Sequence, residues 1–202
     1  MSFEIIFIIV LLFSVIMHEI AHGYVAYLRG DSTAKDMGRL TLNPIPHIDL
    51  FGTIILPILM IFTLGFGVGW AKPVPVNPNN LKNPKVDSFF VSIAGVATNI
   101  MLAIIAGILM RIFGLNPILI GMFVVNIMLA VLNMIPIPPL DGSKALAFFL
   151  PDDIAYKFLS MNSFIGFILL IILLRTGVFS SVLIPIVNFL FVFLTGYQLS
   201  VI

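Results

Sequence analysis

Two histidines and a glutamate lie close together in an apolar stretch near the start of the chain. Residues 15–23 have the sequence VIMHEIAHG, inside an apolar run that begins at Phe3. On a helix His18 and His22 are four positions apart, so both rings project from one face. That spacing lets two imidazoles hold one tetrahedral zinc ion, with Glu19 beside them as a proton acceptor for a water molecule. The motif therefore predicts a hydrolytic metal centre.

The composition places this motif in a membrane. The chain has 202 residues, of which 60% are hydrophobic and 9% charged, whereas a soluble domain is about 25% charged. The apolar runs lack the alternation of barrel strands, so we expect an all-α polytopic membrane protein. An ionisable group in a membrane helix costs roughly 2.5–3.5 kcal/mol, so three of them rarely occur together without a function. A chance motif on a soluble surface helix is the disfavoured alternative.

Several classes of function are excluded or disfavoured at this stage. The formal net charge is +1 and no basic run is present, so we expect no nucleic-acid partner. The chain has no cysteine, which excludes disulfides and thiol chemistry. The first apolar run has no basic segment before it, so we expect a retained helix and not a cleaved signal peptide.

We expect one helical bundle of about five spanning helices plus a re-entrant segment near residues 50–69. The predicted spanning helices are 3–28, 88–113, 117–132, 158–174 and 179–199, with a short helix at 143–150. In the segment 50–69, Pro57 interrupts the apolar run and glycines end it. Its helical part, 51–64, is about 21 Å long, short for a bilayer core of about 30 Å. Residues 1–202 are expected to form a single transmembrane domain, with the core motifs in 15–142 and accessory helices in 158–199.

The basic residues favour the re-entrant path. If residues 50–69 enter the membrane and return, eight of the ten basic residues share one face, and if they cross, the division is five against five. The eight are Arg29, Lys35, Arg39, Lys72, Lys82, Lys85, Lys144 and Lys157, and the other two are Arg111 and Arg175. The positive-inside rule favours the eight-against-two arrangement. We therefore expect a multi-pass plasma-membrane protein with its N-terminus outside and its metal centre toward the cytoplasm.

A catalytic zinc needs a third protein ligand, and Asp141 is the best candidate. The other acids lie in loops or at helix ends, whereas Asp141 follows a proline-broken segment at the end of an inward-running helix. Gly142 permits a tight backbone after it. The alternative is that Asp141 merely caps the short helix that follows.

Four further polar residues are candidates for weaker roles. Asn133 precedes the proline break and could bind the substrate backbone or the oxyanion, so it is predicted to be catalytic. Asn99 and Asn126 lie inside helices, where an interhelical hydrogen bond and a catalytic role are equally plausible. His47 lies in a loop and is expected to be solvated.

The segment 72–76 has the sequence KPVPV, whose prolines forbid a helix. We expect an extended chain that could pair with an unwound substrate as an added strand. In that hypothesis Val74 and Val76 provide free backbone donors. Such pairing would expose the peptide bonds that a helical substrate hides in its own hydrogen bonds.

The motifs together resemble the site-2 protease family of intramembrane zinc metalloproteases. The resemblance lies in His18-Glu19-Ile20-Ala21-His22, in Asn133-x-x-Pro136 and in Leu140-Asp141-Gly142. The segment 92–99, SIAGVATN, is similar to a family segment that usually has proline after the glycine, where this chain has Val96. The resemblance extends from the first helix through Gly142.

That resemblance implies a Zn²⁺ ion held by His18, His22 and Asp141, with Glu19 as the catalytic acid and base. It also implies transmembrane protein or peptide substrates, cleaved within the bilayer of a prokaryotic plasma membrane. A compact member without a PDZ or CBS domain is expected. The substrate's identity and the oligomeric state stay open.

Two other classes of function compete with hydrolysis. A metal transporter or channel could use the same histidines, although polar residues are scarce in the last two predicted helices. A non-catalytic relative could bind membrane segments without cleaving them, although the intact Glu19 disfavours this.

Overall fold

The computed structural model describes residues 3–64 and 69–197. Within these two ranges the chain forms helices and no strands. The helices are α1 (Phe3–Leu28), α2 (Thr33–Asp36), the 3₁₀ turn η1 (Ile45–His47), the π-helix η2 (Leu50–Ile55), α3 (Leu56–Leu64), the 3₁₀ turn η3 (Pro78–Asn80), α4 (Pro84–Phe113), α5 (Pro117–Asn133), α6 (Asp141–Phe149), α7 (Asp152–Leu159), α8 (Ser163–Arg175) and α9 (Val178–Thr195).

Three helices in the described ranges are long and apolar enough to cross a membrane. They are α1 from Ile5 to Leu28, α4 and α9, and the count rises to four if α7 and α8 form one bent span. Two further apolar helices are shorter, at Leu50–Thr63 and in α5. The protein is thus a polytopic helical membrane protein, as the composition predicts. The sequence-based bounds of α1 agree with the structure, and α4 begins four residues earlier than expected.

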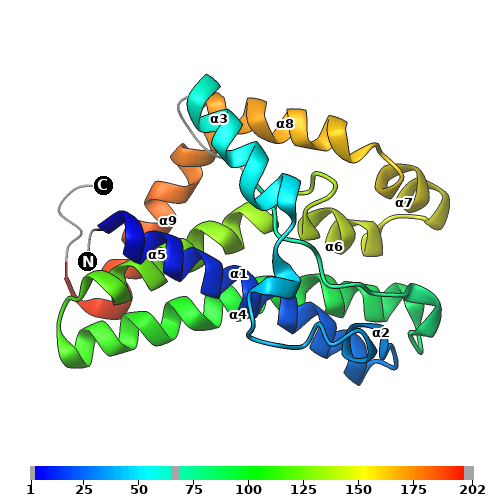
Figure 1. The fold of residues 1–202 in the computed structure, drawn as a ribbon, viewed down its shortest axis with the longest axis horizontal. Helices are drawn as coiled ribbons and strands as arrows, with labels where there is room; N and C mark the ends of the chain where they lie inside the picture. The colour runs from blue at the N-terminus through cyan, green and yellow to red at the C-terminus, as the bar shows by residue number, and fades with distance from the viewer. Residues whose placement is uncertain (1–2, 65–68, 198–202) are drawn as a thin grey trace.

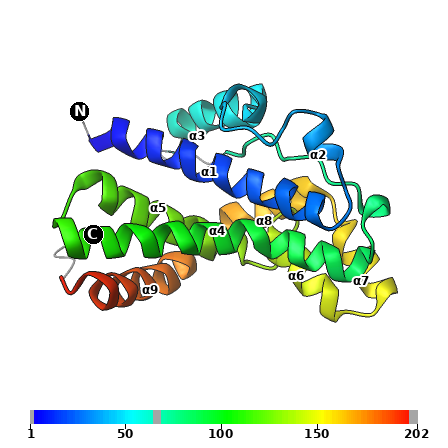
Figure 2. The same ribbon diagram turned by 90° about the horizontal axis from the view of Figure 1, so that it is seen from below.

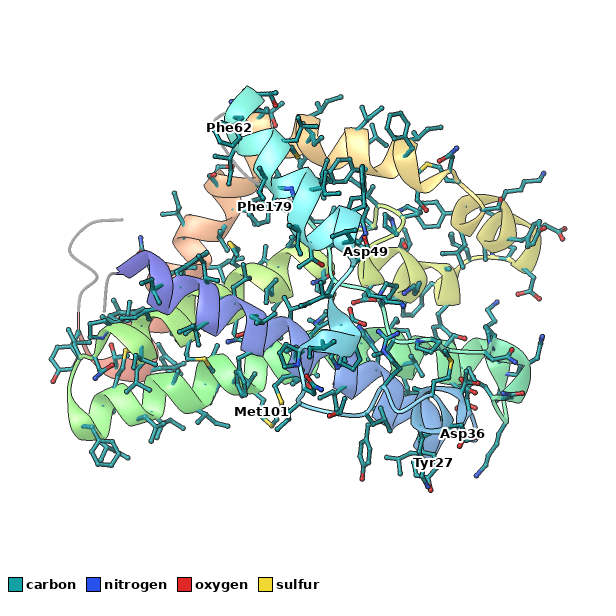
Figure 3. All side chains as sticks on the ribbon, in the orientation of Figure 1. Tyr27, Asp36, Asp49, Phe62, Met101 and Phe179 are labelled. Atoms are coloured by element: carbon teal, nitrogen blue, oxygen red, sulfur yellow. The ribbon has the colours of Figure 1, made fainter. Side chains whose placement is uncertain are left out.

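The segment that precedes the strap of residues 70–77 turns back on itself. It begins as the π-helix η2 and continues as α3, and Pro57 lies in the first turn of α3, where a missing N–H group is tolerated. The backbone N–H of Trp70 donates to the carbonyl of Gly52 at 3.0 Å, so Trp70 lies beside η2, where the segment begins. Figure 3 shows Asp49 at the start of this excursion and Phe62 near its far end. Residues 65–68 of the predicted re-entrant segment lie outside the described ranges, and its entry into a membrane stays a prediction.

Three loops gather at one end of the bundle. Arg29 after α1 pairs with Asp87 in the first turn of α4, with 3.2 Å between the charged groups. Lys85 at the start of α4 pairs with Asp152 at the start of α7 at 2.7 Å. In Figures 1 and 2, α2 and α7 lie at this end, and the first turn of α1 and the last turn of α9 lie at the opposite end. The loops that carry Arg29 and Lys85 therefore lie at the same end of the bundle.

The region after α6 differs from the sequence-based expectation. The sequence predicts a surface loop at residues 151–153, whereas α7 begins at Asp152. Acidic side chains in a first turn are stabilised by the helix dipole. The helix expected over 158–174 is interrupted, because its first two residues end α7 and α8 begins only at Ser163, with a bend of 77° between α7 and α8. The side chain of Asn162 accepts a hydrogen bond from the backbone N–H of Phe164 at 2.8 Å. This cap starts α8 as a separate helix.

The helix α4 forms the centre of the bundle. It contacts α1 and α5 along its length, and α9 packs on its other side (Figure 2). An apolar cluster joins α4, α5 and α9, and it consists of Ala103, Ala106, Met110, Phe123, Ile127, Val187 and Phe191. A smaller cluster joins α1 to α5. These contacts fix α1 against α4 and α5, and so position the histidines.

Candidate metal centre

Three side-chain atoms converge between α1 and α6. His18 Nε2 and His22 Nε2 each lie 3.0 Å from Asp141 Oδ2, and the two nitrogens are 3.0 Å apart. The three residues are buried, with exposed fractions of 6%, 8% and 6%. They could hold a metal ion, with one ligand atom from each residue. The structure therefore brings together the three residues that the sequence proposed as ligands.

The local structure explains how each ligand reaches this point. His18 and His22 are one turn apart on α1, so their rings lie on the same face, in edge contact with 4.6 Å between the ring centroids. The helix α5 ends at Asn133, and α6 begins at Asp141 after a proline-rich turn. A Cβ atom on Gly142 would clash with the carbonyl oxygen of Met134, so glycine lets α6 begin against this turn. The carboxylate is thereby held in the first turn of α6, facing α1.

The hydrogen bonds behind the two rings show that a cation fits the site. His22 Nδ1 lies 2.6 Å from the carbonyl oxygen of Val91, which can only accept, so this nitrogen donates and Nε2 keeps its lone pair. His18 Nδ1 lies 2.6 Å from Asn99 Oδ1, which is also an acceptor. Two lone pairs and a carboxylate then face one another at 3.0 Å. Neighbouring nitrogen and oxygen ligands of tetrahedral zinc are about 3.3 Å apart, close to this spacing.

The Asp141 carboxylate has a positive charge beside it. Burial raises the pKa of Asp141, whereas the nearby charge of Lys144 lowers it. Lys144 Nζ lies 3.3 Å from Asp141 Oδ1, the oxygen that does not face the histidines. One oxygen is thus directed at the two rings while the other contacts an ammonium group.

Glu19 is held by the backbone of the strap, which we define as residues 70–77. Its Oε2 accepts a hydrogen bond from the N–H of Val74 at 2.7 Å. The expectation that Val74 offers a free donor to a substrate is therefore wrong. The side chain of Val74 also packs against Gly23, where an added Cβ atom would lie 2.7 Å from Val74 Cγ1. The strap thus lies along the face of α1 that carries Glu19.

Buried groups fasten the strap on both sides of Val74. The N–H of Lys72 donates to the carbonyl of His47 at 2.9 Å. The guanidinium of Arg39 donates to the carbonyls of Lys72 and Pro73 at 2.8 and 3.2 Å. The N–H of Asn77 donates to Asp31 Oδ2 at 2.7 Å. These bonds fix the backbone that reaches Glu19.

The weaker candidates have different outcomes. Asn133 donates its amide to the carbonyl of Leu129 at 3.0 Å, and in the described ranges it is not part of the three-ligand group, so its catalytic role stays a prediction. His47 is 1% exposed and bonds to the carbonyl of Thr41, so the expectation of a solvated histidine is wrong. Asn99 and Asn126 both take part in buried hydrogen bonds that lead to His18.

Sequence reasoning missed one residue that makes room for the site. A Cβ atom on Gly95 would lie 2.5–2.6 Å from three atoms of the His18 ring, so this position of α4 accepts only glycine while the ring stays in place. Gly95 and Asn99 are four residues apart and share the face of α4 that meets His18. That spacing within an apolar helix was the signal that could have identified the pair.

Comparisons with known proteins agree with this geometry. Residues 6–115 match the model of peptidase family M50. The protein named "Putative zinc metalloprotease YwhC" of Bacillus subtilis is 39% identical over 194 residues, which cover 90% of this chain and 85% of that protein. "Putative zinc metalloprotease Rip2" of Mycolicibacterium smegmatis is 31% identical over 87% of this chain and 70% of its own length.

A more distant relative is an archaeal protein. "Zinc metalloprotease MJ0392" of Methanocaldococcus jannaschii is 27% identical over 197 residues, and the match covers about half of that protein, 48%. No solved structure matches the chain significantly.

The helical membrane fold and these matches define the class of protein, a membrane-embedded zinc metalloprotease. The chain belongs to peptidase family M50. The matched residues 6–115 include both histidines and Glu19, and Asp141 lies beyond them. The relatives' names indicate zinc as the metal.

Proposed function

We propose that this protein cleaves peptide bonds in membrane-spanning segments, using a zinc ion held by His18, His22 and Asp141. The observation that carries the proposal is the convergence of three buried ligand atoms, each 3.0 Å from the other two, in a bundle of apolar helices. Two of the ligands come from α1, which is long and apolar enough to span a membrane. A substrate that reaches them must enter or adjoin the bilayer, which favours transmembrane protein or peptide substrates.

A zinc ion bound there supplies Lewis-acid chemistry, which activates water and polarises a carbonyl group. The residues of this chain perform the other tasks. His18 and His22 offer Nε2 lone pairs because their Nδ1 atoms donate to Asn99 and Val91. Glu19 follows His18 directly and carries a carboxylate that can accept a proton from the water and pass it to the leaving amine.

The strap gives Glu19 a defined orientation. The hydrogen bond from the Val74 N–H engages Oε2 at 2.7 Å and leaves Oε1 to exchange the proton. A positioned acid or base contributes about 10²- to 10⁴-fold to the rate of a reaction. Val74 is therefore proposed as a positioning residue for the catalytic carboxylate.

We further propose a plasma-membrane location with the basic loops in the cytoplasm. The grouping of Arg29, Lys82 and Lys85 at one end of the bundle supports this orientation under the positive-inside rule. The ligand-bearing end of α1 is its C-terminal half, close to these loops, so the site lies toward the cytoplasmic side. Residues 1–202 act as one domain in this proposal.

The experiment that tests the function compares wild type with Glu19→Gln in reconstituted vesicles. A tagged transmembrane peptide serves as substrate, and bound zinc and zinc flux are measured on the same samples. We expect Glu19→Gln to keep its zinc and to lose cleavage by at least about 100-fold. Cleavage at the wild-type rate by this variant would overturn the proposed mechanism. Zinc flux in both proteins without cleavage in either would identify a transporter.

A further inference from the structure

A chain of buried amide groups leads from His18 to the backbone of α5. His18 Nδ1 lies 2.6 Å from Asn99 Oδ1, and Asn99 Nδ2 donates to Asn126 Oδ1 at 2.7 Å. Asn126 Nδ2 then donates to Ser14 Oγ at 2.9 Å and to the carbonyl of Met122 at 2.8 Å. Asn99, Asn126 and Ser14 are 0% exposed. The chain thus connects α1, α4 and α5 without contact with solvent.

The carbonyl of Met122 determines which group is the donor and which the acceptor in each hydrogen bond of this series. A carbonyl oxygen only accepts, so Asn126 must present its NH₂ group to Met122 and its oxygen to Asn99. Asn99 must then present its NH₂ group to Asn126 and its oxygen to His18. The His18 Nδ1 atom consequently carries a hydrogen, and Nε2 carries the lone pair. Reversing the amides would place two oxygens, those of Asn126 and Met122, at 2.8 Å.

Both ligand histidines carry the ring hydrogen on Nδ1, but different contacts fix this tautomer in each of them. His22 donates directly to a backbone carbonyl, that of Val91, so a single contact fixes its tautomer. His18 faces an amide side chain, which could present either its oxygen or its nitrogen to the ring. Only the next amide, Asn126, removes that ambiguity. The tautomer of His18 therefore depends on a residue that does not touch the ring.

We propose that Asn126 is a positioning residue that acts through Asn99 to hold His18 in the tautomer with a free Nε2 lone pair. The inference rests on the proposed metal site, because only there is this lone pair required. Outer partners of metal-binding histidines typically change metal affinity by about 10- to 100-fold when they are removed. We expect a change of that size from Asn126, which is linked to His18 through Asn99.

The test uses Asn126→Leu, with Ser14→Ala as a matched control in full-length protein. Asn126→Leu removes the group that orients Asn99, whereas Ser14→Ala removes a terminal acceptor and leaves the Met122 carbonyl to set the direction. Zinc affinity is measured by competition with a chelating dye. We expect about 10- to 100-fold weaker binding for Asn126→Leu and wild-type binding for Ser14→Ala. Asn126→Ala serves the same purpose if the leucine variant does not fold.

A second measurement reports the tautomer directly. The chain has three histidines. Their ¹⁵N ring signals in zinc-free protein are recorded at a pH where all three rings are neutral. We expect Asn126→Leu to convert His18 to a mixture of tautomers and to leave the signals of His22 unchanged. A single unchanged His18 tautomer together with wild-type zinc affinity would overturn the inference.

The outcome is separable from the proposed function. If wild-type protein binds zinc and His18→Ala abolishes that binding, the metal site stands whatever Asn126→Leu does. If His18→Ala binds zinc as wild type does, the metal site itself fails.

Discussion

The two halves of α4 are buried against neighbouring helices by different means. The first half carries Gly95 and Asn99 toward α1, where Gly95 gives the His18 ring its space and Asn99 bonds to it. The second half carries Ala103, Ala106, Gly107 and Met110 into an apolar cluster with α5 and α9. Both halves are buried to a similar degree. The packing of the first half depends on specific contacts with the His18 ring, and the packing of the second half depends on the volume of its apolar side chains. We therefore expect them to respond differently to similar substitutions.

The sharpest test of this contrast is the same substitution at two glycines of α4. In Gly95→Ala the new Cβ atom would lie 2.5–2.6 Å from the His18 ring, so the ring must leave its present position beside His22 and Asp141. We expect zinc affinity to fall about 10- to 100-fold or more, with cleavage lost in proportion. Equilibrium dialysis against zinc measures the affinity.

The control is Gly107→Ala in the apolar half. Its Cβ atom would lie 2.9 Å from Leu194 Cβ, a close contact without a ligand. We expect about 1–3 kcal/mol of destabilisation with wild-type zinc affinity. Equal losses of zinc affinity in both variants would remove the distinction between the two halves.

Next in size is the effect of removing the donor to Glu19. Pro73 and Pro75 already flank Val74, so Val74→Pro suits the extended strap and deletes the N–H group, while it also replaces the valine side chain. Misplacing a catalytic group can cost about 100-fold in rate, so we expect kcat to fall by up to that factor with KM and bound zinc unchanged. Val74→Ala keeps the N–H group and should cleave nearly as wild type does. Steady-state kinetics on a transmembrane peptide distinguish the two variants, and equal kcat values would contradict the role of the strap.

A smaller effect is expected at Asp31, which joins the end of α1 to the strap. Burial would raise the pKa of Asp31, but hydrogen bonds from Thr33, Asn77 and Asn80 outweigh it and lower the pKa below its ordinary value. Since the folded pKa is lowered, the stabilisation is present above the unfolded pKa and is lost as the pH falls through the folded value. Asp31→Asn should cost about 1–3 kcal/mol near neutral pH, and this difference should shrink as the solution is acidified. Thermal unfolding in detergent at several pH values tests this, and a pH-independent difference would count against it.

The smallest effect is expected from a volume-conserving change in the apolar half. Met110 is fully buried in the cluster with Phe123 and Phe191. Met110→Leu should cost less than about 1.5 kcal/mol and leave zinc binding and kcat as in wild type. A strong loss of activity would show that side-chain packing in the apolar half of α4 affects the geometry of the metal site.

The sequence alone predicted those parts of the site whose signal is local. His18 and His22 follow from their four-residue spacing on one helix, and Asp141 follows from an acid after a proline break. The roles of Gly95 and the Val91 carbonyl were not predicted, and the Val74 N–H group was predicted to serve a substrate and not Glu19. These roles depend on how α4 and the strap pack against α1. The bend between α7 and α8 was also missed. The cap at Asn162 lies inside the range 158–174 that was expected to form one helix, and the prediction did not include a break at its polar neighbours Ser160 and Ser163.

The central claim is that two imidazoles and the Asp141 carboxylate hold one zinc ion. The most direct test is the zinc content of purified wild-type, His18→Ala, His22→Ala, Asp141→Ala and Glu19→Gln proteins, each checked for helical content by circular dichroism. We predict about one zinc ion per chain in wild type and Glu19→Gln, and loss of stoichiometric zinc in the other three. Stoichiometric zinc in folded Asp141→Ala, bound as tightly as in wild type, would contradict the account.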